Sequence, residues 1–194
     1  MISKKIFIIL GHPDTETFTG MLADEYENSA LAGGHQVRRM NIGELSFDPI
    51  LHKGYKEIQE LEPDLKEIQK NIQWADHVVI LYPNWWNTMP ALLKGMFDRM
   101  WIPGFAFNFD KKTKSVIQRL KGKSARVIVV AGTNNSFMTW LKFGDCTNEI
   151  KRGILEFSGL GPVKVTTFGP CNKEDRGVRE RWKREVKELG RRGC

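Results

Sequence analysis

The sequence contains few cysteines and lacks any long apolar segment. Its three cysteines, Cys146, Cys171 and Cys194, are odd in number and do not have the spacing of metal ligands, so we expect no bound metal. Free thiols are typical of a reducing compartment, and we therefore expect a cytoplasmic protein. No apolar run reaches the roughly 20 residues that a membrane-spanning helix needs, which argues against membrane insertion. GHPD follows the first apolar run directly, so we interpret that run as a strand and not as a signal peptide.

Several signatures of well-known sites are missing too. The chain has neither the GxxxxGKS/T pattern of a phosphate-binding P-loop nor the GxGxxG pattern of a dinucleotide-binding turn. It has no Ser/His/Asp or Cys/His constellation, so no side chain stands out as a nucleophile.

The composition is that of one ordinary globular domain spanning residues 1–194. Hydrophobic residues make up 41% and charged residues 27%, and we find no repeat or linker. The net charge is +7, and much of it lies in 173–192. There the charges alternate in sign while Trp182, Val186 and Leu189 recur at helical spacing. This pattern favours a solvated amphipathic helix over a nucleic-acid surface, so we expect no nucleic-acid partner.

Strand and helix patterns alternate along the chain. Strands are expected at 5–10, 35–42, 77–83, 124–132 and 162–169. Helices are expected at 21–32, 63–75, 91–101 and 147–157, and in the charged C-terminal segment. This order predicts an α/β fold in which a five-stranded parallel sheet is covered by helices on both faces. With five strands, we expect the flavodoxin-like order 2-1-3-4-5 in a three-layer sandwich.

Three unusual loops follow the first, third and fourth expected strands, at 11–20, 83–90 and 131–138. In such sheets, ligands bind beyond the carboxyl ends of the strands, beside the point where the strand order reverses. The first and third strands flank that point, so these loops form the expected site.

The first loop suits a phosphate. Thr15, Thr17 and Thr19 offer hydroxyl groups just before a helix N-terminus, where free N–H groups and the helix dipole attract anions. The alternative is that these threonines only cap the helix. His12 could pair with a phosphate oxygen, although a single histidine after a strand is more often structural.

The second loop carries the adjacent pair Trp85 and Trp86. A tryptophan pair here can form the wall of a flat aromatic ligand such as a flavin isoalloxazine, while backbone N–H groups meet its polar edge. The alternative is core packing, but two adjacent residues cannot easily both face inward. In the third loop, Gly132 permits close approach, Thr133 can hydrogen-bond and Phe137 can cover a ring, which is a weaker signal.

Together these pieces resemble the NAD(P)H:quinone oxidoreductase family of flavodoxin-like proteins, which includes modulator-of-drug-activity proteins and ancillary flavoproteins of potassium-efflux systems. The matching segments are 11–18, 34–51, 75–101, 104–107 and 153–169. The PNWWNTMPALLKG segment is the most specific of them, and the resemblance covers nearly the whole chain.

The resemblance implies a flavoprotein enzyme that transfers hydride in two-electron, ping-pong fashion from NAD(P)H to quinone-like acceptors. It implies a homodimer and a bound flavin, with FMN favoured over FAD because nothing reads as an adenine pocket. By motif match, flavin contacts would come from His12, Thr17, Phe18, Thr19, Pro83, Asn84, Trp85, Trp86, Asn87, Gly132 and Thr133. The acceptor pocket would be lined by Trp86, Phe107, Phe109 and Phe137, with the residues of 101–109 often reaching a neighbour's flavin. Packing of 101–109 within its own chain is the alternative.

The chain departs from the family in one respect. Many members carry a Tyr–His pair after the fourth strand, whereas this sequence has Phe137 and no histidine beyond residue 77. Backbone amides, or Asn134 and Asn135, would have to stabilise a reduced flavin, which leaves the acceptor class open. Two rival functions remain: a non-catalytic flavin-binding regulatory subunit of a transporter, and a flavodoxin-type electron carrier. The charge of +7 argues against the carrier, since such carriers are commonly acidic.

Overall fold

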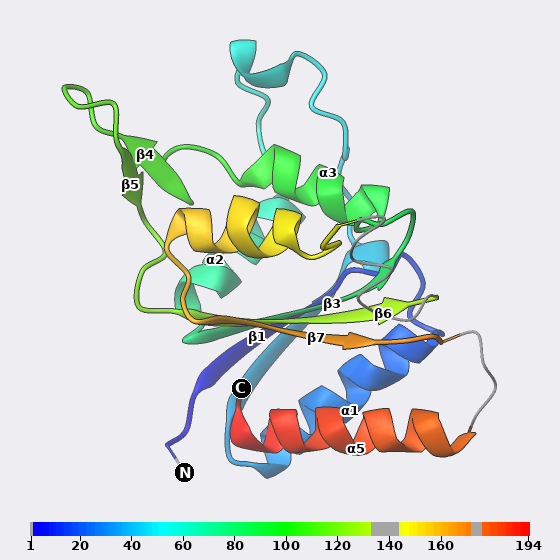
Figure 1. Cartoon of the computed structure of the whole chain (residues 1–194). Helices are drawn as coiled ribbons and strands as arrows, with labels where there is room; N and C mark the ends of the chain where they lie inside the picture. Colours follow the sequence, from blue (N-terminus) through cyan, green and yellow to red (C-terminus); the bar gives the residue numbers. More distant parts are fainter. Residues whose placement is uncertain (1, 133–143, 172–175) are drawn as a thin grey trace.

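A five-stranded parallel sheet forms the middle layer of the protein in the computed structural model, which describes residues 2–132, 144–171 and 176–194 (Figure 1). The strands are β1 (Lys5–Leu10), β2 (Gln36–Asn41), β3 (His77–Asn84), β6 (Ser124–Ala131) and β7 (Val163–Phe168). Their order is β2-β1-β3-β6-β7, and all four pairings are parallel. This confirms the predicted order 2-1-3-4-5.

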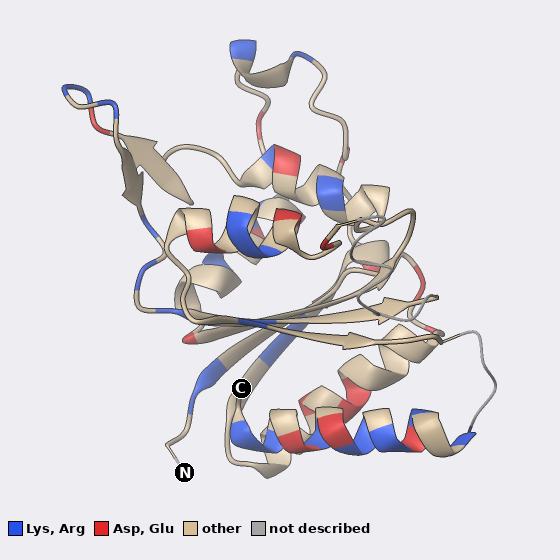
Figure 2. Cartoon of the chain, viewed as in Figure 1, with Lys and Arg blue, Asp and Glu red and all other residues tan. Residues whose placement is uncertain are grey.

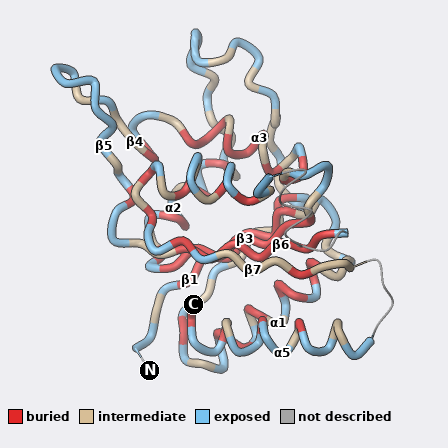
Figure 3. Tube along the Cα trace, viewed as in Figure 1, coloured by how far each residue is buried: buried red, intermediate tan, exposed pale blue. Residues whose placement is uncertain are grey.

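The three central strands are apolar on both faces because helices cover both sides. Every residue from Ile6 to Leu10 is buried, and so are nearly all residues of β3 and β6. Continuous apolar runs of this kind are typical of a parallel sheet covered twice. The edge strands β2 and β7 are less buried. Figure 3 shows the buried segments gathered in the sheet and on the inward faces of the helices.

One face of the sheet is covered by α1 (Phe18–Ala32) and α5 (Arg176–Arg192). Residues on this side, such as Ile8, Tyr26 and Trp182, form one core cluster. The other face is covered by α2 (Pro63–Trp74), α3 (Ala91–Met100) and the helical turns η3 (Glu149–Leu155) and η4 (Glu156–Ser158). A second cluster, including Ile9, Ile68 and Met96, fills this side.

The last helix has the predicted amphipathic character. Acidic and basic residues alternate along α5 (Figure 2), while Trp182 and Val186 are buried in the core cluster on this side of the sheet. Across the described ranges, none of the helices is both long enough and apolar enough to span a bilayer.

The structure differs from the sequence prediction on the α3 side of the sheet. The helix expected at 147–157 is a π-helical turn, η3, that continues into a 3₁₀ turn, η4. A hairpin of β4 (Phe107–Phe109) and β5 (Val116–Gln118) was not predicted, because three-residue strands are too short to show alternation. Short 3₁₀ turns, η1 (Ile42–Glu44) and η2 (Gly54–Lys56), lie in the long segment between β2 and α2.

The first part of the segment 101–109 packs within its own chain, as one of the two alternatives predicted. Trp101, Phe105 and Ala106 are buried in the core of their own chain, whereas Phe109 is exposed. The first part therefore packs internally, and the hairpin that follows projects from the body of the molecule (Figure 1).

Candidate functional site

The candidate site lies at the carboxyl edge of the sheet, where β1, β3 and β6 end side by side. Leu10 pairs with Leu81 across β1 and β3, and Asn84 pairs with Ala131 across β3 and β6. The N–H of Gly11 donates to the carbonyl of Leu81 at 2.7 Å, which joins the first loop to β3. The three expected loops therefore start from one edge. Gly132 is exposed there, whereas Thr133, Asn134, Asn135 and Phe137 lie outside the described residues.

The first loop is organised by its own side chains. Nδ1 of His12 accepts a hydrogen bond from the Asp14 N–H at 2.9 Å, and Oδ1 of Asp14 accepts from the Glu16 N–H at 2.8 Å. Because Nδ1 is an acceptor, a neutral His12 ring carries its proton on Nε2, where it can donate to a ligand.

Thr17 is the N-cap of α1. Its Oγ1 accepts from the Gly20 N–H at 3.2 Å, so the capping alternative holds for this threonine. The N–H groups of Phe18 and Thr19 belong to the first turn, where a helix provides no acceptor of its own. The first turn contains no acidic residue, so the positive end of the helix dipole is not neutralised there.

Phe18 points away from the expected ligand position. Its ring lies 6.0 Å from the ring of Trp182, and the Arg179 guanidinium lies 5.4 Å from the Phe18 centroid. Both neighbours belong to α5, so Phe18 can meet a ligand at the site only through its backbone.

The tryptophan turn, residues 85–88, is a two-residue hairpin at the end of β3. The N–H of Trp85 donates to the Thr88 carbonyl at 2.9 Å, and the Thr88 N–H donates back at 3.1 Å. The central residues have positive φ, 53° at Trp86 and 66° at Asn87, a conformation that non-glycine residues rarely adopt. The Trp86 residue is 99% exposed and Trp85 is 43% exposed. The pair therefore does not belong to the core.

Trp85 connects the tryptophan turn to the first loop. Its ring and that of His12 make an edge-to-face contact with centroids 5.3 Å apart and planes at 75°.

The residues of β3 that precede Trp85 are more enclosed. Pro83 is buried, and Oδ1 of Asn84 is buried without a hydrogen-bond partner in the described part of the chain. Burial, and the nearby Cys146, Glu149 and Asp145, raise the pKa of Tyr82 above its ordinary value.

The two phenylalanines expected in an acceptor pocket border different hollows. Phe107 lies 5.4 Å from Phe109 and 5.2 Å from Phe157, measured between ring centroids. Phe107 and Phe157 line a cavity of about 320 Å³ beside α3. Phe109 lines a more open hollow of about 730 Å³ next to the tip of the β4–β5 hairpin. Phe157 was not expected from the sequence, since an aromatic residue in a helical pattern gives no sign of which way it faces.

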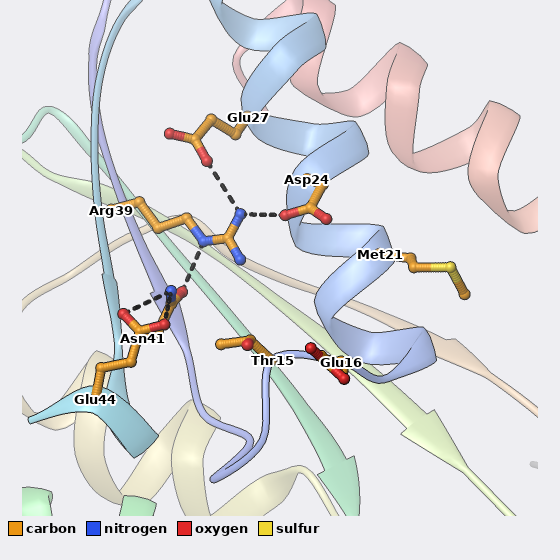
Figure 4. Close-up of a pocket in the computed structure, with 8 residues that line it drawn as sticks. All are labelled: Thr15, Glu16, Met21, Asp24, Glu27, Arg39, Asn41 and Glu44. Carbon is orange, nitrogen blue, oxygen red and sulfur yellow. Dashed lines mark hydrogen bonds and ion pairs between the residues drawn. The ribbon is translucent and has the colours of Figure 1, made fainter.

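A third hollow, of about 570 Å³, borders the first loop on its other side (Figure 4). Arg39 lies at its centre, and its Nη1 pairs with Asp24 at 2.6 Å and Glu27 at 3.0 Å. Its Nε donates to Asn41, whose amide in turn donates to Glu44. The guanidinium is thus neutralised by its neighbours, and the carboxylates of Glu16 and Glu44 leave the hollow with a net negative charge. This hollow is unsuited to a phosphate, which leaves the N-terminus of α1 as the candidate phosphate position.

Two glycines shape the first loop and were not expected from the sequence. A Cβ on Gly43 would lie 1.8 Å from the Pro13 carbonyl oxygen, and one on Gly20 would lie 2.0 Å from that of Thr15. Only glycine allows these close approaches. In a single sequence, neither residue can be distinguished from a glycine in an ordinary turn.

Comparison with known proteins identifies the family. A family model described as flavodoxin-like fold matches residues 4–189. The Escherichia coli protein named uncharacterized NAD(P)H oxidoreductase YcaK is 27% identical, covering 89% of this chain and 86% of the relative. The NAD(P)H:quinone oxidoreductase of Methanothermobacter marburgensis superposes with a TM-score of 0.86 over the whole of both chains at 23% identity.

A second solved structure has a ligand-bound site. The FMN-dependent NADH-azoreductase of Bacillus anthracis, determined in complex with FMN, superposes with a TM-score of 0.79 over 98% of this chain and 99% of that one, at 19% identity. At such identities the solved structures establish the shared fold. The resemblance inferred from the sequence is confirmed, and the chain belongs to the flavodoxin-like fold family.

Proposed function

We propose that this protein is a flavin-dependent NAD(P)H oxidoreductase that reduces quinone-like acceptors by a ping-pong mechanism. The observation that carries the proposal is the contact between His12 and Trp85, which joins an exposed aromatic wall to the N-terminus of α1. The names of the relatives, an NAD(P)H oxidoreductase and a quinone oxidoreductase, support the same activity.

The residues at the carboxyl edge fit the chemical groups of a flavin. An isoalloxazine needs an apolar wall, which the half-exposed Trp85 can supply. Its polar edge needs donors and acceptors, and the buried Oδ1 of Asn84 is an acceptor without a partner in the described chain. The phosphate needs N–H donors, which Phe18 and Thr19 offer at the start of α1, and His12 Nε2 can add another.

FMN suits this site better than FAD. The N-terminus of α1 provides for one phosphate. The hollow beside Thr15 and Glu16 contains four carboxylates and one guanidinium, so its net negative charge would repel a second phosphate. The FMN bound by the azoreductase relative supports this choice.

The protein would bind and orient the reactants, while the flavin, when bound, supplies hydride transfer between the nicotinamide and the acceptor. Trp85 would exclude water from one side of the bound ring. The backbone N–H groups of Trp86 and Gly132 would stabilise negative charge on the ring's polar edge. NAD(P)H and the acceptor would bind in turn at the same open face, which gives ping-pong kinetics.

We also propose that two copies of the chain associate. Large apolar side chains are exposed on the segment between β2 and α2, at Tyr55 and Ile58, and on the hairpin, at Phe109 and Ile117. Both segments project on the α3 side of the sheet (Figure 1). Patches of this kind usually mark an interface. Sedimentation as a monomer at micromolar concentration would overturn this part of the proposal.

The activity is tested by incubating the purified protein with FMN, desalting it and recording its absorbance. NADH or NADPH is then added without oxygen, and an uncharged naphthoquinone follows. A retained yellow band that bleaches with one nucleotide and returns with the quinone is the expected result. A band that is retained but does not bleach would indicate a flavin-binding subunit without reductase activity. Loss of both FMN and FAD on desalting would overturn the proposal.

A further inference from the structure

The amino edge of the sheet, where the strands begin, lies opposite the candidate site and carries positive charge. Four basic residues are exposed there: Lys5 at the start of β1, Lys121 before β6, Lys164 in β7 and Arg192 at the end of α5. In the described chain, none of these four side chains forms an ion pair. Figure 2 shows basic residues at the start of β1, before β6 and at the end of α5, on the side where both chain ends lie.

The remaining charges at this edge do not cancel the four exposed ones. Lys4 and Lys123 are partly buried, and their amino groups donate to backbone carbonyls, so their positive charges are not neutralised by carboxylates. Glu188 is already paired with Arg191 at 2.8 Å. Asp76 is exposed beside the start of β1, where Oδ2 accepts a backbone N–H at 2.9 Å. Six cations therefore outnumber the carboxylate of Asp76.

The carboxyl edge, which carries the candidate site, has the opposite charge. Its exposed charged residues include Asp14, Glu16, Glu44, Asp145 and Glu149. The described loops 11–17, 84–90 and 144–148 contain neither lysine nor arginine. Positive and negative charge are thus separated along the direction of the strands. A negatively charged surface would attract the amino edge and repel the edge that carries the site.

Two exposed apolar side chains lie among the basic residues of the amino edge. Ile2 is 87% exposed and Leu31, near the end of α1, is 52% exposed. Hydrogen bonds bring the two segments together, since Oγ of Ser3 donates to the Gly34 carbonyl at 2.7 Å and the Gly34 N–H donates to the Leu31 carbonyl at 3.0 Å. Lys4, the next residue along the chain, is joined to the residue that follows α5 by a bond of 2.7 Å. The apolar side chains therefore lie close to the end of α5.

We propose that this amino-edge patch, formed by Ile2, Leu31, Lys5, Lys121, Lys164 and Arg192, docks on an anionic phospholipid membrane. Ile2 and Leu31 would enter the headgroup layer, the cations would contact lipid phosphates, and the candidate site would face solution. Exposed apolar side chains surrounded by lysine and arginine are typical of proteins that lie on a membrane without crossing it.

Other surfaces and occupants fit less well. Surfaces that bind single-stranded nucleic acid add aromatic side chains for base stacking, and the exposed aromatic rings of the described chain belong to other segments. The exposed apolar residues of the β4–β5 hairpin are accounted for by the proposed association of two copies. The amino-edge patch lies at the other end of the strands from the candidate site, so membrane docking leaves that site open.

The first test is sedimentation of the untagged protein with vesicles of phosphatidylcholine, alone or mixed with phosphatidylglycerol. We expect binding to the mixed vesicles that weakens as salt is added, and no binding to the neutral ones. Lys121→Glu combined with Lys164→Glu should weaken binding at least about tenfold, because each basic residue near an anionic surface contributes about fivefold.

Arg181→Glu combined with Arg184→Glu is the matched control. It changes the net charge equally, at exposed positions of α5 that lie about 12 Å or more before Arg192 along the helix axis. This pair should weaken binding by no more than about twofold, since salt screens charges more than about 10 Å from the lipid. Equal weakening by the two pairs would show that net charge alone attracts the protein, and would overturn the inference.

The second test concerns the apolar side chains. Ile2→Ser combined with Leu31→Ser keeps every charge of the patch and removes the apolar groups. It should weaken binding to the mixed vesicles at least about fivefold through lost contact with the headgroup layer. Wild-type binding in this variant would contradict the insertion of Ile2 and Leu31 and overturn that part of the inference.

Two further outcomes would also overturn the inference. One is the absence of binding to the mixed vesicles, and the other is binding of an RNA oligonucleotide in place of vesicles, which would assign the patch to nucleic acid. The variants of the patch change residues away from the candidate site, so each should retain FMN as the wild type does. Vesicle binding does not depend on the proposed function, and it would stand even if no flavin were retained.

Discussion

The ring of His12 packs edge-on against the ring of Trp85, with 5.3 Å between their centroids. The two residues are far apart in the sequence and meet because β1 and β3 are neighbours in the sheet, with Leu10 paired to Leu81. Their contact means that the loop before α1 and the tryptophan turn share one wall. A ligand that contacted both segments would have its phosphate end beside His12 and its ring beside Trp85.

The two tryptophans of the turn are expected to respond differently to replacement by alanine, Trp85 in FMN affinity and Trp86 in the free energy of unfolding. Trp85→Ala removes a half-exposed aromatic wall, so it should weaken FMN binding at least tenfold through lost burial and stacking. Trp86→Ala removes a side chain that is almost fully exposed, so the free energy of unfolding should change by no more than about 0.5 kcal/mol. FMN fluorescence titration and urea unfolding measure the two effects. Wild-type FMN affinity in Trp85→Ala would rule out a role for this ring.

Gly43 is expected to be essential for the shape of the first loop. In Gly43→Ala the new Cβ would be placed 1.8 Å from the Pro13 carbonyl oxygen, so the loop that carries His12 must move. Such overpacking costs about 1–3 kcal/mol of stability. The displaced loop should also weaken FMN binding at least tenfold.

Ser46→Ala, at an exposed position close by, serves as the control for Gly43→Ala and should leave both quantities unchanged. The two variants are compared by thermal melting and by FMN titration. A Gly43→Ala protein with wild-type melting temperature and wild-type affinity would contradict the expected role of this glycine.

Arg99 should be a major source of stability for the segment between β2 and α2. Its guanidinium is buried, donates to both carboxylate oxygens of Glu62 at 3.1 and 3.0 Å, and donates to the carbonyls of Asp48 and Glu60. Burial acts to raise the pKa of Glu62, but the hydrogen bond from Arg99 and further hydrogen bonds to the backbone keep that pKa below its ordinary value.

Arg99→Met should therefore lower the free energy of unfolding by about 3–5 kcal/mol, because Glu62 and two carbonyls lose their donor. Combining Arg99→Met with Glu62→Leu removes the unpaired charge as well, so the double variant should be more stable than Arg99→Met alone. Urea denaturation of the wild type and the variants gives these values. A loss below about 1 kcal/mol in Arg99→Met would mean that the contacts contribute little.

The layers of the fold could be predicted because burial on both faces leaves a clear pattern. The continuous apolar runs of β1, β3 and β6 follow from helices covering both sides of the sheet. The β4–β5 hairpin left no such pattern, since each strand has only three residues. The π-helical turn at η3 was also missed, because its apolar spacing resembles that of an α-helix.

The position of the candidate site could be predicted, but the directions of its side chains could not. Topology alone places the loops after β1, β3 and β6 at one edge. Whether a given side chain faces the site depends on packing around it. Phe18 turns toward α5, Trp86 faces solvent, and Glu149 lies beside Thr88 only because η3 is folded over the sheet.

His77 should make the stability of the protein fall in mildly acidic solution. Its ring is buried, with Nδ1 2.7 Å from Oγ of Ser124 and Nε2 without a partner in the described chain. Burial, together with the positive charges of Lys4 and Arg126, lowers the pKa of His77 to about 3. In the unfolded chain the pKa is about 6.5, so below that pH the unfolded state binds more protons than the folded state. The stabilisation from the neutral ring is therefore complete above about pH 6.5 and is lost as the pH falls toward 3.

His77→Gln isolates this effect, because glutamine keeps a polar side chain but does not titrate. Between pH 7 and 5, the wild type should lose about 2 kcal/mol more of its free energy of unfolding than the variant, since each pH unit contributes up to about 1.4 kcal/mol. The contributions of Asp48 and Glu62, whose pKa values are lowered in the folded protein, are present in both the wild type and the variant and cancel in this comparison. Urea denaturation at pH 7, 6.5, 6, 5.5 and 5 provides the comparison. Parallel stability curves for the two proteins would mean that His77 becomes protonated without unfolding the sheet around it.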